Sequence, residues 1–181
     1  MKIAILTASY LPAVGGRQVF AYNISRRFAA SGHTVDVYVP KRAFQALRPP
    51  FLELLRPLPR WFYGLVWKLP AIGLFRAHCY LRRVQRTEGY DAWLTIATFP
   101  SGYVGACLQG TVPTVLRASG DDIQKSAEMG YGLRLDPRLE AKIRRAVRSF
   151  DSVVAMTETA RTDLLDLGVR QEAIVGIPNG V

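Results

Sequence analysis

The chain has 181 residues, which is enough for one ordinary domain with a sizeable core and too few for two. Apolar residues make up 49% and charged residues 21%, a mixture typical of a folded globular protein rather than a disordered or fibrous one. The two cysteines, Cys79 and Cys107, form no C-x-x-C pair, which excludes a zinc knuckle and a redox motif and leaves a reducing cytoplasm as the expected compartment.

The net charge of +10 is concentrated in one part of the chain. Residues 41–86 contain ten Lys or Arg and a single acid, Glu53, so nine of the ten net positive charges lie there. The apolar run at residues 3–6 is shorter than the roughly 7–15 residues of a signal-peptide core. We interpret it as part of a first buried strand.

The first elements predicted are a strand, a helix and a strand. Residues 2–8 are an apolar run, typical of a strand buried on both faces of a parallel sheet. In residues 17–30 apolar side chains recur every fourth position, and Gly32 is placed to end this helix. Residues 34–39 are rich in β-branched residues, which completes a βαβ unit.

The rest of the chain continues the alternation. Further strands are predicted at residues 92–96, 114–118 and 152–155, with a weaker pattern at 173–177. Helical patterns separate them, and Thr157 is placed to N-cap a helix that ends before Gly168. The alternation predicts an α/β fold, a Rossmann-like, open, mostly parallel sheet with helices on both faces.

Ligands of such sheets bind beyond the carboxyl ends of the strands. The loops predicted at those ends are residues 9–16, 100–101, 119–122 and 156–158. We expect the first strand to lie inside the sheet and these four loops to gather at one edge.

The first of these loops places Gly15 and Gly16 directly before a helix. Free N–H groups and the positive end of the helix dipole favour an anion there, such as a phosphate. The alternative interpretation is that the two glycines only make a tight strand-to-helix turn. The loop has neither the G-x-G-x-x-G fingerprint nor the lysine and hydroxyl of a P-loop, which argues against nicotinamide and ATP chemistry.

Two stretches of the chain are similar to glycosyltransferase family 4. The opening MKIAILTASYLPAVGG, followed by a helix and then GHTV, resembles the family's strand, Y-x-P, Gly-Gly loop, helix and G-H-x-V. The closing DSVVAMTETARTDLLDLGVRQEAIVGIPNGV resembles its strand, Ser or Thr, helix, Gly-Val and I-P-N-G-V. The resemblance covers about residues 1–40 and 90–181 and leaves the basic segment unmatched.

This resemblance implies one half of a GT-B fold. In that fold the N-terminal domain holds the acceptor, the C-terminal domain holds a nucleotide sugar, and the sugar is transferred in the cleft between them, here with retention expected. Residues 1–181 would be the acceptor-side domain, with a basic aromatic helical segment at about 41–88, and the donor domain would follow. A UDP- or GDP-sugar donor, a glycan, polysaccharide or lipid-linked envelope acceptor and no separate cofactor are therefore expected, and the 181 residues alone should be inactive.

The resemblance also assigns residues to the donor side of the cleft. Gly15 and Gly16 match the loop that approaches the donor's phosphates. Arg17 begins the next helix, where it either contacts phosphate or is a solvated first-turn residue. Asn179 and Gly180 are expected to make the interdomain hinge turn.

A second loop stands where family members have H-G-x-[DE]. This chain has Ser119, Gly120 and Asp121 there, so serine replaces the histidine. A serine cannot be charged or act as an acid near neutral pH, so no role of that imidazole transfers and the catalytic residue is left unassigned. With Tyr10 and Thr157, these three residues are expected to line the acceptor site, although an N-cap role alone would explain Thr157.

No metal site is predicted, and neither histidine is placed for catalysis. His33 lies in a turn at the end of the sheet away from the four loops, and His78 has no acidic or cysteine neighbour at metal-ligand spacing.

The basic segment also carries aromatic side chains and has two interpretations. Lys68 and Pro70 interrupt an apolar stretch too short to span a bilayer. Either it is an interfacial element that contacts an anionic membrane, or it is a core-packed helix whose basic face is only solvated. The candidate contact residues are Trp61, Trp67, Arg82, Arg83 and Arg86. Membrane contact would place the protein on the inner face of the cytoplasmic membrane; without a recognition motif, nucleic acid is not expected.

Two functions of different classes remain. One is the sugar-transferring half described above. The other is a non-catalytic, Rossmann-like binding module that docks to a membrane surface or a partner protein. The residues that follow position 181 would distinguish them.

Overall fold

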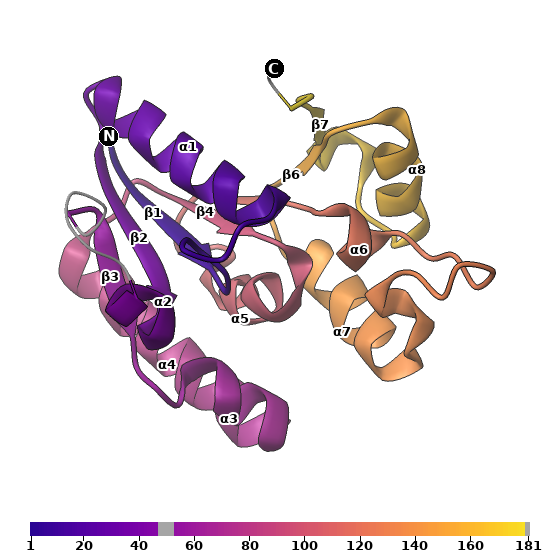
Figure 1. The fold of residues 1–181 in the computed structure, drawn as a ribbon, viewed down its shortest axis with the longest axis horizontal. Coiled ribbons are helices and arrows are strands. Elements are labelled where there is room, and N and C mark those ends of the chain that lie inside the picture. The colour runs from indigo at the N-terminus through magenta and orange to yellow at the C-terminus, as the bar shows by residue number, and fades with distance from the viewer. Residues whose placement is uncertain (47–52, 180–181) are drawn as a thin grey trace.

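The computed structural model describes residues 1–46 and 53–179. In this part of the chain, parallel strands form one open sheet in the order β3-β2-β1-β4-β5-β6-β7 (Figure 1). The strands are β1 (Lys2–Thr7), β2 (Thr34–Pro40), β3 (Leu55–Leu58), β4 (Ala92–Ile96), β5 (Thr114–Arg117), β6 (Ser152–Ala155) and β7 (Ile174–Gly176). The first strand lies inside the sheet, between β2 and β4, as expected.

Helices connect the strands. They are α1 (Gly16–Ala30), α2 (Lys41–Ala46), α3 (Phe62–Lys68), α4 (Pro70–Glu88), α5 (Tyr103–Gly105), α6 (Gly120–Ile123), α7 (Pro137–Val147) and α8 (Glu158–Asp166). Shorter turns of 3-10 or π type are η1 (Thr98–Gly102), η2 (Ala106–Leu108), η3 (Leu133–Leu135) and η4 (Gln171–Ala173).

Alternate residues of β1 pack against helices on opposite faces of the sheet. Ile3 and Ile5 share a core with the apolar side of α1, whereas Ala4 and Leu6 share one with α3 and α4. This is the period of two that a strand imposes, and it explains why β1 reads as a continuous apolar run. The predicted open α/β sheet with helices on both faces is confirmed.

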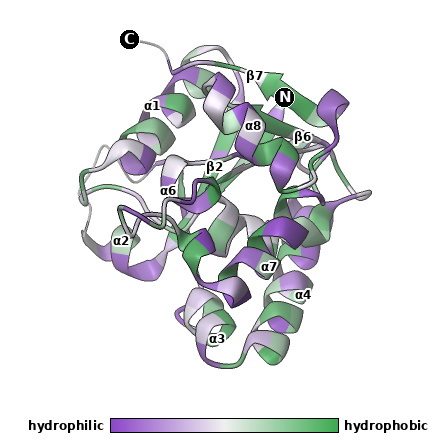
Figure 2. Ribbon diagram, turned by 90° about the vertical axis from the view of Figure 1, so that its right-hand side faces the viewer, coloured by the Kyte–Doolittle hydropathy of each residue, from purple (hydrophilic) through white to green (hydrophobic). Residues whose placement is uncertain are grey.

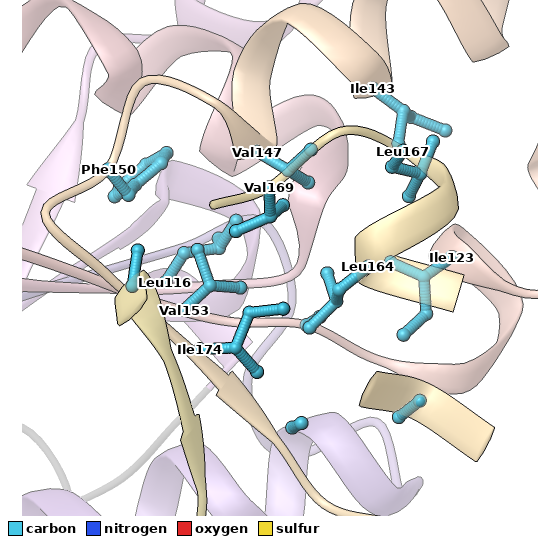
Figure 3. Packing of buried hydrophobic residues seen from close by; sticks show 14 of the residues in the cluster. Leu116, Ile123, Ile143, Val147, Phe150, Val153, Leu164, Leu167, Val169 and Ile174 are labelled. Carbon is cyan, nitrogen blue, oxygen red and sulfur yellow. The ribbon is translucent and has the colours of Figure 1, made fainter. Parts of the chain in front are cut away.

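A third core lies under β5, β6 and β7. The buried side of α7, with Ile143 and Val147, meets Leu164 of α8 and Val153 of β6 (Figure 3). Pro137 stands at the start of α7, and the Asp136 carboxylate accepts a hydrogen bond from the Arg138 amide at 2.8 Å, which caps the helix.

The observed α1 agrees with the helix predicted at residues 17–30 and begins one residue earlier. It ends where Gly32 takes a positive φ of 84°, a backbone conformation that suits glycine after a helix. The chain then enters β2 directly.

The basic segment, expected to be helical, contains a strand as well. β3 pairs with β2 at the edge of the sheet, where Pro57 costs no ladder hydrogen bond to a further strand. With four residues, β3 is too short to show a strand period. The remaining described residues of the segment form α2, α3 and α4.

Helices α3 and α4 form a hairpin at the bottom of Figures 1 and 2. Gly73 of α4 lies against the α3 backbone, because a Cβ built there would come within 2.4 Å of the Leu65 carbonyl carbon. The buried side of the hairpin packs with Trp93 of β4. Neither α4 nor any other described helix combines the length and the hydropathy needed to cross a bilayer.

Candidate functional site

Two of the predicted loops meet through an ion pair. Arg17 lies in the first turn of α1, and its guanidinium pairs with the carboxylate of Asp121 in α6, 104 positions further along the chain. Both side chains are about two thirds buried, at 31% and 34% exposed. The loops after β1 and β5 therefore share the carboxyl edge of the sheet, as expected.

Asp122 joins the loop after β5 to the loop after β4. Its fully buried carboxylate accepts hydrogen bonds from the Thr98 amide at 2.5 Å and from the Ser119 amide at 2.8 Å. Burial raises the pKa of Asp122 to about 6, although the two amide donors act in the opposite direction. The carboxylate thus holds Ser119 and Gly120 in place at this edge.

The N-terminus of α1 is uncovered at Gly16 and bordered by the Gln18 side chain at Gly15. Gly15 has an extended backbone with φ −178°, a conformation any residue can adopt, so the turn does not require glycine there. The Gln18 side-chain oxygen lies 2.7 Å from the position a Cβ would take on Gly15, whereas at Gly16 no described atom outside the local backbone lies within 4 Å of that position. The first turn of α1 is therefore uncovered at Gly16, which favours the interpretation as an anion site over that as a tight turn.

A buried arginine at the end of β5 holds the last described residues of the chain. Arg117 is only 5% exposed, and its guanidinium lies 3.9 Å from the ring centroid of Phe20 in α1. It donates hydrogen bonds to the Met156 sulfur and, at 2.9 Å, to the side-chain oxygen of Asn179. Burial lowers the pKa of Arg117. Asn179, one of the two predicted hinge residues, is thus tied to the sheet, and Gly180 lies outside the described residues.

A groove of about 990 Å³ runs beside this edge, between the ends of β1 to β3 and helices α2 and α3. Its polar and aromatic lining includes Tyr10, Lys41, Arg42, Arg60, Tyr63 and Trp67. Tyr10 is 4% exposed, and its hydroxyl hydrogen-bonds with Ser25 of α1 at 3.4 Å. The groove is large enough for a sugar-sized acceptor.

Thr157 caps α8. Its hydroxyl accepts a hydrogen bond from the Ala160 amide at 3.1 Å, and its side chain is exposed at the end of β6. The cap explains the residue type. An acceptor contact by Thr157 stays a prediction.

The five candidate membrane residues divide into two groups. Trp61 is half-buried and packs edge-on against Tyr80, with Arg76 4.8 Å from its ring. Trp67 packs on Phe99 but stays 53% exposed. The other three, Arg82, Arg83 and Arg86, are exposed on α4, where the Arg82 guanidinium also donates to the Cys107 carbonyl at 3.2 Å.

Within residues 1–46 and 53–179, no cluster of three His, Cys, Asp or Glu side chains is arranged to hold a metal ion. His78 is half-buried, and desolvation lowers its pKa to about 4. His33 packs edge-on against Phe28 of α1.

Three features of the site were not predicted from the sequence. The S-x-x-D spacing of Ser119 and Asp122 is a capping-box signal that would have drawn attention to the carboxylate. An arginine at the end of an apolar strand would have marked Arg117. For the groove cations, however, no signal in the sequence tells a lining residue from a solvated one.

Solved structures with the same fold span more than one activity. Anabaena Alr3699/HepE in complex with UDP and glucose is 21% identical, with a TM-score of 0.63, over 100% of this chain and 45% of that one. The lipopolysaccharide outer core galactosyltransferase WaaB is 12% identical, with a TM-score of 0.71, over 100% and 46%. The UDP-GlcNAc 2-epimerase from Methanocaldococcus jannaschii is 14% identical, with a TM-score of 0.66, over 99% and 46%. The chain therefore spans less than half the length of these structures, and at such identities the likeness shows the fold alone.

The sequence itself identifies the family. No curated protein matches the chain. The model of the Glycosyltransferase Family 4 matches residues 14–181, which include the open glycine loop, the Ser119–Asp121 loop and the segment that ends with Asn179. Because this family model matches most of the chain and the sheet has the architecture of one half of a GT-B fold, the chain belongs to glycosyltransferase family 4.

Proposed function

We propose that this chain is the acceptor-side half of a retaining glycosyltransferase that moves a sugar from a UDP- or GDP-sugar to a glycan, polysaccharide or lipid-linked envelope acceptor. The observation that carries the proposal is the N-terminus of α1, which is uncovered at Gly16 and lies beside Arg17 at the same sheet edge as the groove. A donor-binding domain in the same polypeptide is part of the proposal, since the structures with this fold are about twice as long.

The roles of the residues at the donor side follow from the charge that develops during transfer. During transfer the bond between the anomeric carbon and the diphosphate breaks, the acceptor oxygen bonds to that carbon, and the acceptor's proton passes to the departing diphosphate. Negative charge grows on the diphosphate, and the first-turn N–H groups of α1 with the Arg17 cation would stabilise it. Asp121 holds Arg17 in place and partly neutralises it before the donor arrives.

The donor part of the proposal is tested by binding. The 181-residue chain supplies one wall of the donor site, so calorimetry with UDP-, GDP- and ADP-sugars should give dissociation constants well above about 1 μM. Joined to its donor domain, the protein should release UDP or GDP in an acceptor-dependent way, and Arg17→Gln should lower kcat/KM at least about tenfold, as expected for a lost charge contact at the leaving group. Unchanged kcat/KM in this variant would remove Arg17 from the donor site.

We further propose that the protein contacts an anionic membrane through the exposed side of α3 and α4. Four large apolar side chains are exposed within nine residues, Trp67, Leu69, Ile72 and Phe75, the last at 69%. Exposed cations follow on the same hairpin, among them Arg83 and Arg86. Apolar side chains that enter the headgroup boundary beside cations that meet anionic lipid are the pattern of an interfacial element. Trp61 supports this surface from within.

Cosedimentation with liposomes tests the membrane contact. Vesicles with anionic lipid should bind the chain and release it as salt rises, because the field is screened within about 8–10 Å at physiological ionic strength. Arg83→Gln with Arg86→Gln should weaken binding by up to about 2 kcal/mol, whereas Arg26→Gln with Arg27→Gln on α1, over the other face of the sheet, should change it little. Equal binding to anionic and neutral vesicles at low salt would contradict the contact and leave a solvated basic face.

A further inference from the structure

The groove beside the α1 loop is lined by cations that have no acidic partner among the residues the structure describes. Lys41 and Arg42 come from the start of α2, and Arg60 comes from the turn between β3 and α3. None of the three forms an ion pair with a residue that the structure describes, and residues 47–52 contain no acidic side chain in the sequence.

The two acids nearest in the sequence, Asp36 and Glu53, do not line the groove, and Asp36 pairs with Arg56. Glu53 lines a separate pocket of about 300 Å³, together with Tyr22 and Arg26 of α1. The described lining of the groove therefore has three cations and no carboxylate. Cations gathered in a cleft raise the local concentration of anions, and each forms a charge-assisted hydrogen bond with a phosphate that is shorter and stronger than a neutral one.

Aromatic side chains of α3, Tyr63 and Trp67, also line the groove. The Tyr63 hydroxyl hydrogen-bonds with the Ser101 hydroxyl at 3.2 Å, and the Trp67 ring packs edge-on against Phe99 with centroids 4.8 Å apart. These contacts join α3 to the loop after β4, so the two aromatic side chains lie at the edge of the sheet where the proposed donor loop lies.

Trp67 belongs both to the groove lining and to an exposed apolar surface. Beyond it along the α3–α4 hairpin lie Leu69, Ile72 and Phe75, all more than half exposed. A cationic cleft that leads into an apolar surface is complementary to an amphiphile, with the anionic group in the cleft and the hydrocarbon outside it.

We propose that the groove binds the phosphate-type head group of a lipid-linked acceptor, with its hydrocarbon chain lying on the surface from Trp67 to Phe75. The proposal rests on the proposed function, and it narrows the acceptor to an anionic amphiphile. Lys41, Arg42 and Arg60 hold the phosphate, and the Trp67 ring marks the boundary between head group and chain.

The test uses three probes below their micelle concentrations. Octyl phosphate carries both features, octyl glucoside has the same chain without the charge, and inorganic phosphate has the charge without the chain. Calorimetry of the 181-residue chain at low salt should show octyl phosphate binding at least tenfold more tightly than either of the others. Octyl glucoside binding as tightly as octyl phosphate would overturn the proposal, because the head group would then not be recognised. Inorganic phosphate binding as tightly would overturn the part played by the apolar surface.

Matched variants locate the binding. Replacing Arg42 and Arg60 by glutamine should weaken octyl phosphate binding at least tenfold, whereas Arg138→Gln with Arg145→Gln, the same charge change on the exposed side of α7, should weaken it less than twofold. Equal losses in the two double variants would overturn the groove as the site. Circular dichroism and thermal unfolding of each variant exclude misfolding as the cause.

This experiment involves no donor and no transfer. A protein that transfers sugar but shows no preference for octyl phosphate would contradict this inference alone. One that binds octyl phosphate in the groove but transfers no sugar when joined to its donor domain would contradict the proposed function alone.

Discussion

Arg17 and Asp121 form an ion pair that joins the first turn of α1 to the first turn of α6 across the carboxyl edge of the sheet. The pair connects the proposed donor-phosphate loop to the loop in which serine replaces the family's histidine. It makes Arg17 an ordered residue of the site, and its charge remains partly accessible to a ligand.

We expect this pair to contribute little to stability. Arg17→Gln and Asp121→Asn should each lower the free energy of unfolding by less than about 1 kcal/mol. In a partly exposed ion pair, the attraction between the charges is nearly offset by the water contacts that each side chain loses. A double-mutant cycle in urea measures the coupling, with Arg170→Gln in the fully surface Arg170–Glu172 pair as control. A loss above about 2 kcal/mol for either variant would show that the pair is structural.

Its neighbour Asp122 should behave differently. Asp122→Ala leaves the buried Thr98 and Ser119 amides without their acceptor, which should cost about 2–4 kcal/mol at pH 7, since each unsatisfied buried donor costs about 1–3 kcal/mol. Asp121→Ala, one position earlier, should cost less than about 1 kcal/mol. Urea unfolding of both variants measures the difference, and equal losses would contradict the assigned role of Asp122.

The α3–α4 hairpin depends on one glycine. Gly73→Ala would place a Cβ about 2.4 Å from the Leu65 backbone and must push the helices apart, at an expected cost of about 1–3 kcal/mol. Gly64→Ala on the exposed side of α3, where no described atom lies within 4 Å, should stabilise the chain by up to about 1 kcal/mol. Thermal unfolding compares the two, and a neutral Gly73→Ala would show that the helices are not in close contact.

His78 should make the chain less stable in acid. Its pKa is lowered to about 4 in the folded state by desolvation, so between about pH 6.5 and 4 the unfolded chain binds a proton that the folded chain does not. The free energy of unfolding should therefore fall as pH drops through this range, by about 1 kcal/mol once solvent screening of this half-buried ring is allowed for.

Comparing the parent protein with its His78→Gln variant isolates the contribution of His78 to the loss of stability in acid. Asp122 acts in the opposite direction, because its raised pKa means that the folded chain holds the extra proton between about pH 4 and 6. Its contribution is the same in the parent and in the variant, so it cancels in the difference. Urea unfolding at pH 5 and pH 7 should show a smaller acid loss in the variant, and an unchanged loss would contradict a neutral buried His78.

Most of the fold could be predicted because its elements have local signals. The apolar run of β1, the apolar side chains at every fourth position of α1 and the cap at Thr157 are each visible within a short stretch of the sequence. The structure confirms all three elements. β3 escaped prediction because its four residues show no period and it is ordered by pairing with β2.

The candidate site, like the fold, was predictable only where its signals are local in the sequence. The sequence alone determined that loops after four strands meet at one edge, since parallel strands all end on the same side, and that Gly15 and Gly16 open a helix there. Which side chains meet was decided by tertiary structure. The Arg17–Asp121 pair and the groove with its three cations depend on segments far apart in the sequence, and only the packed sheet brings those segments together.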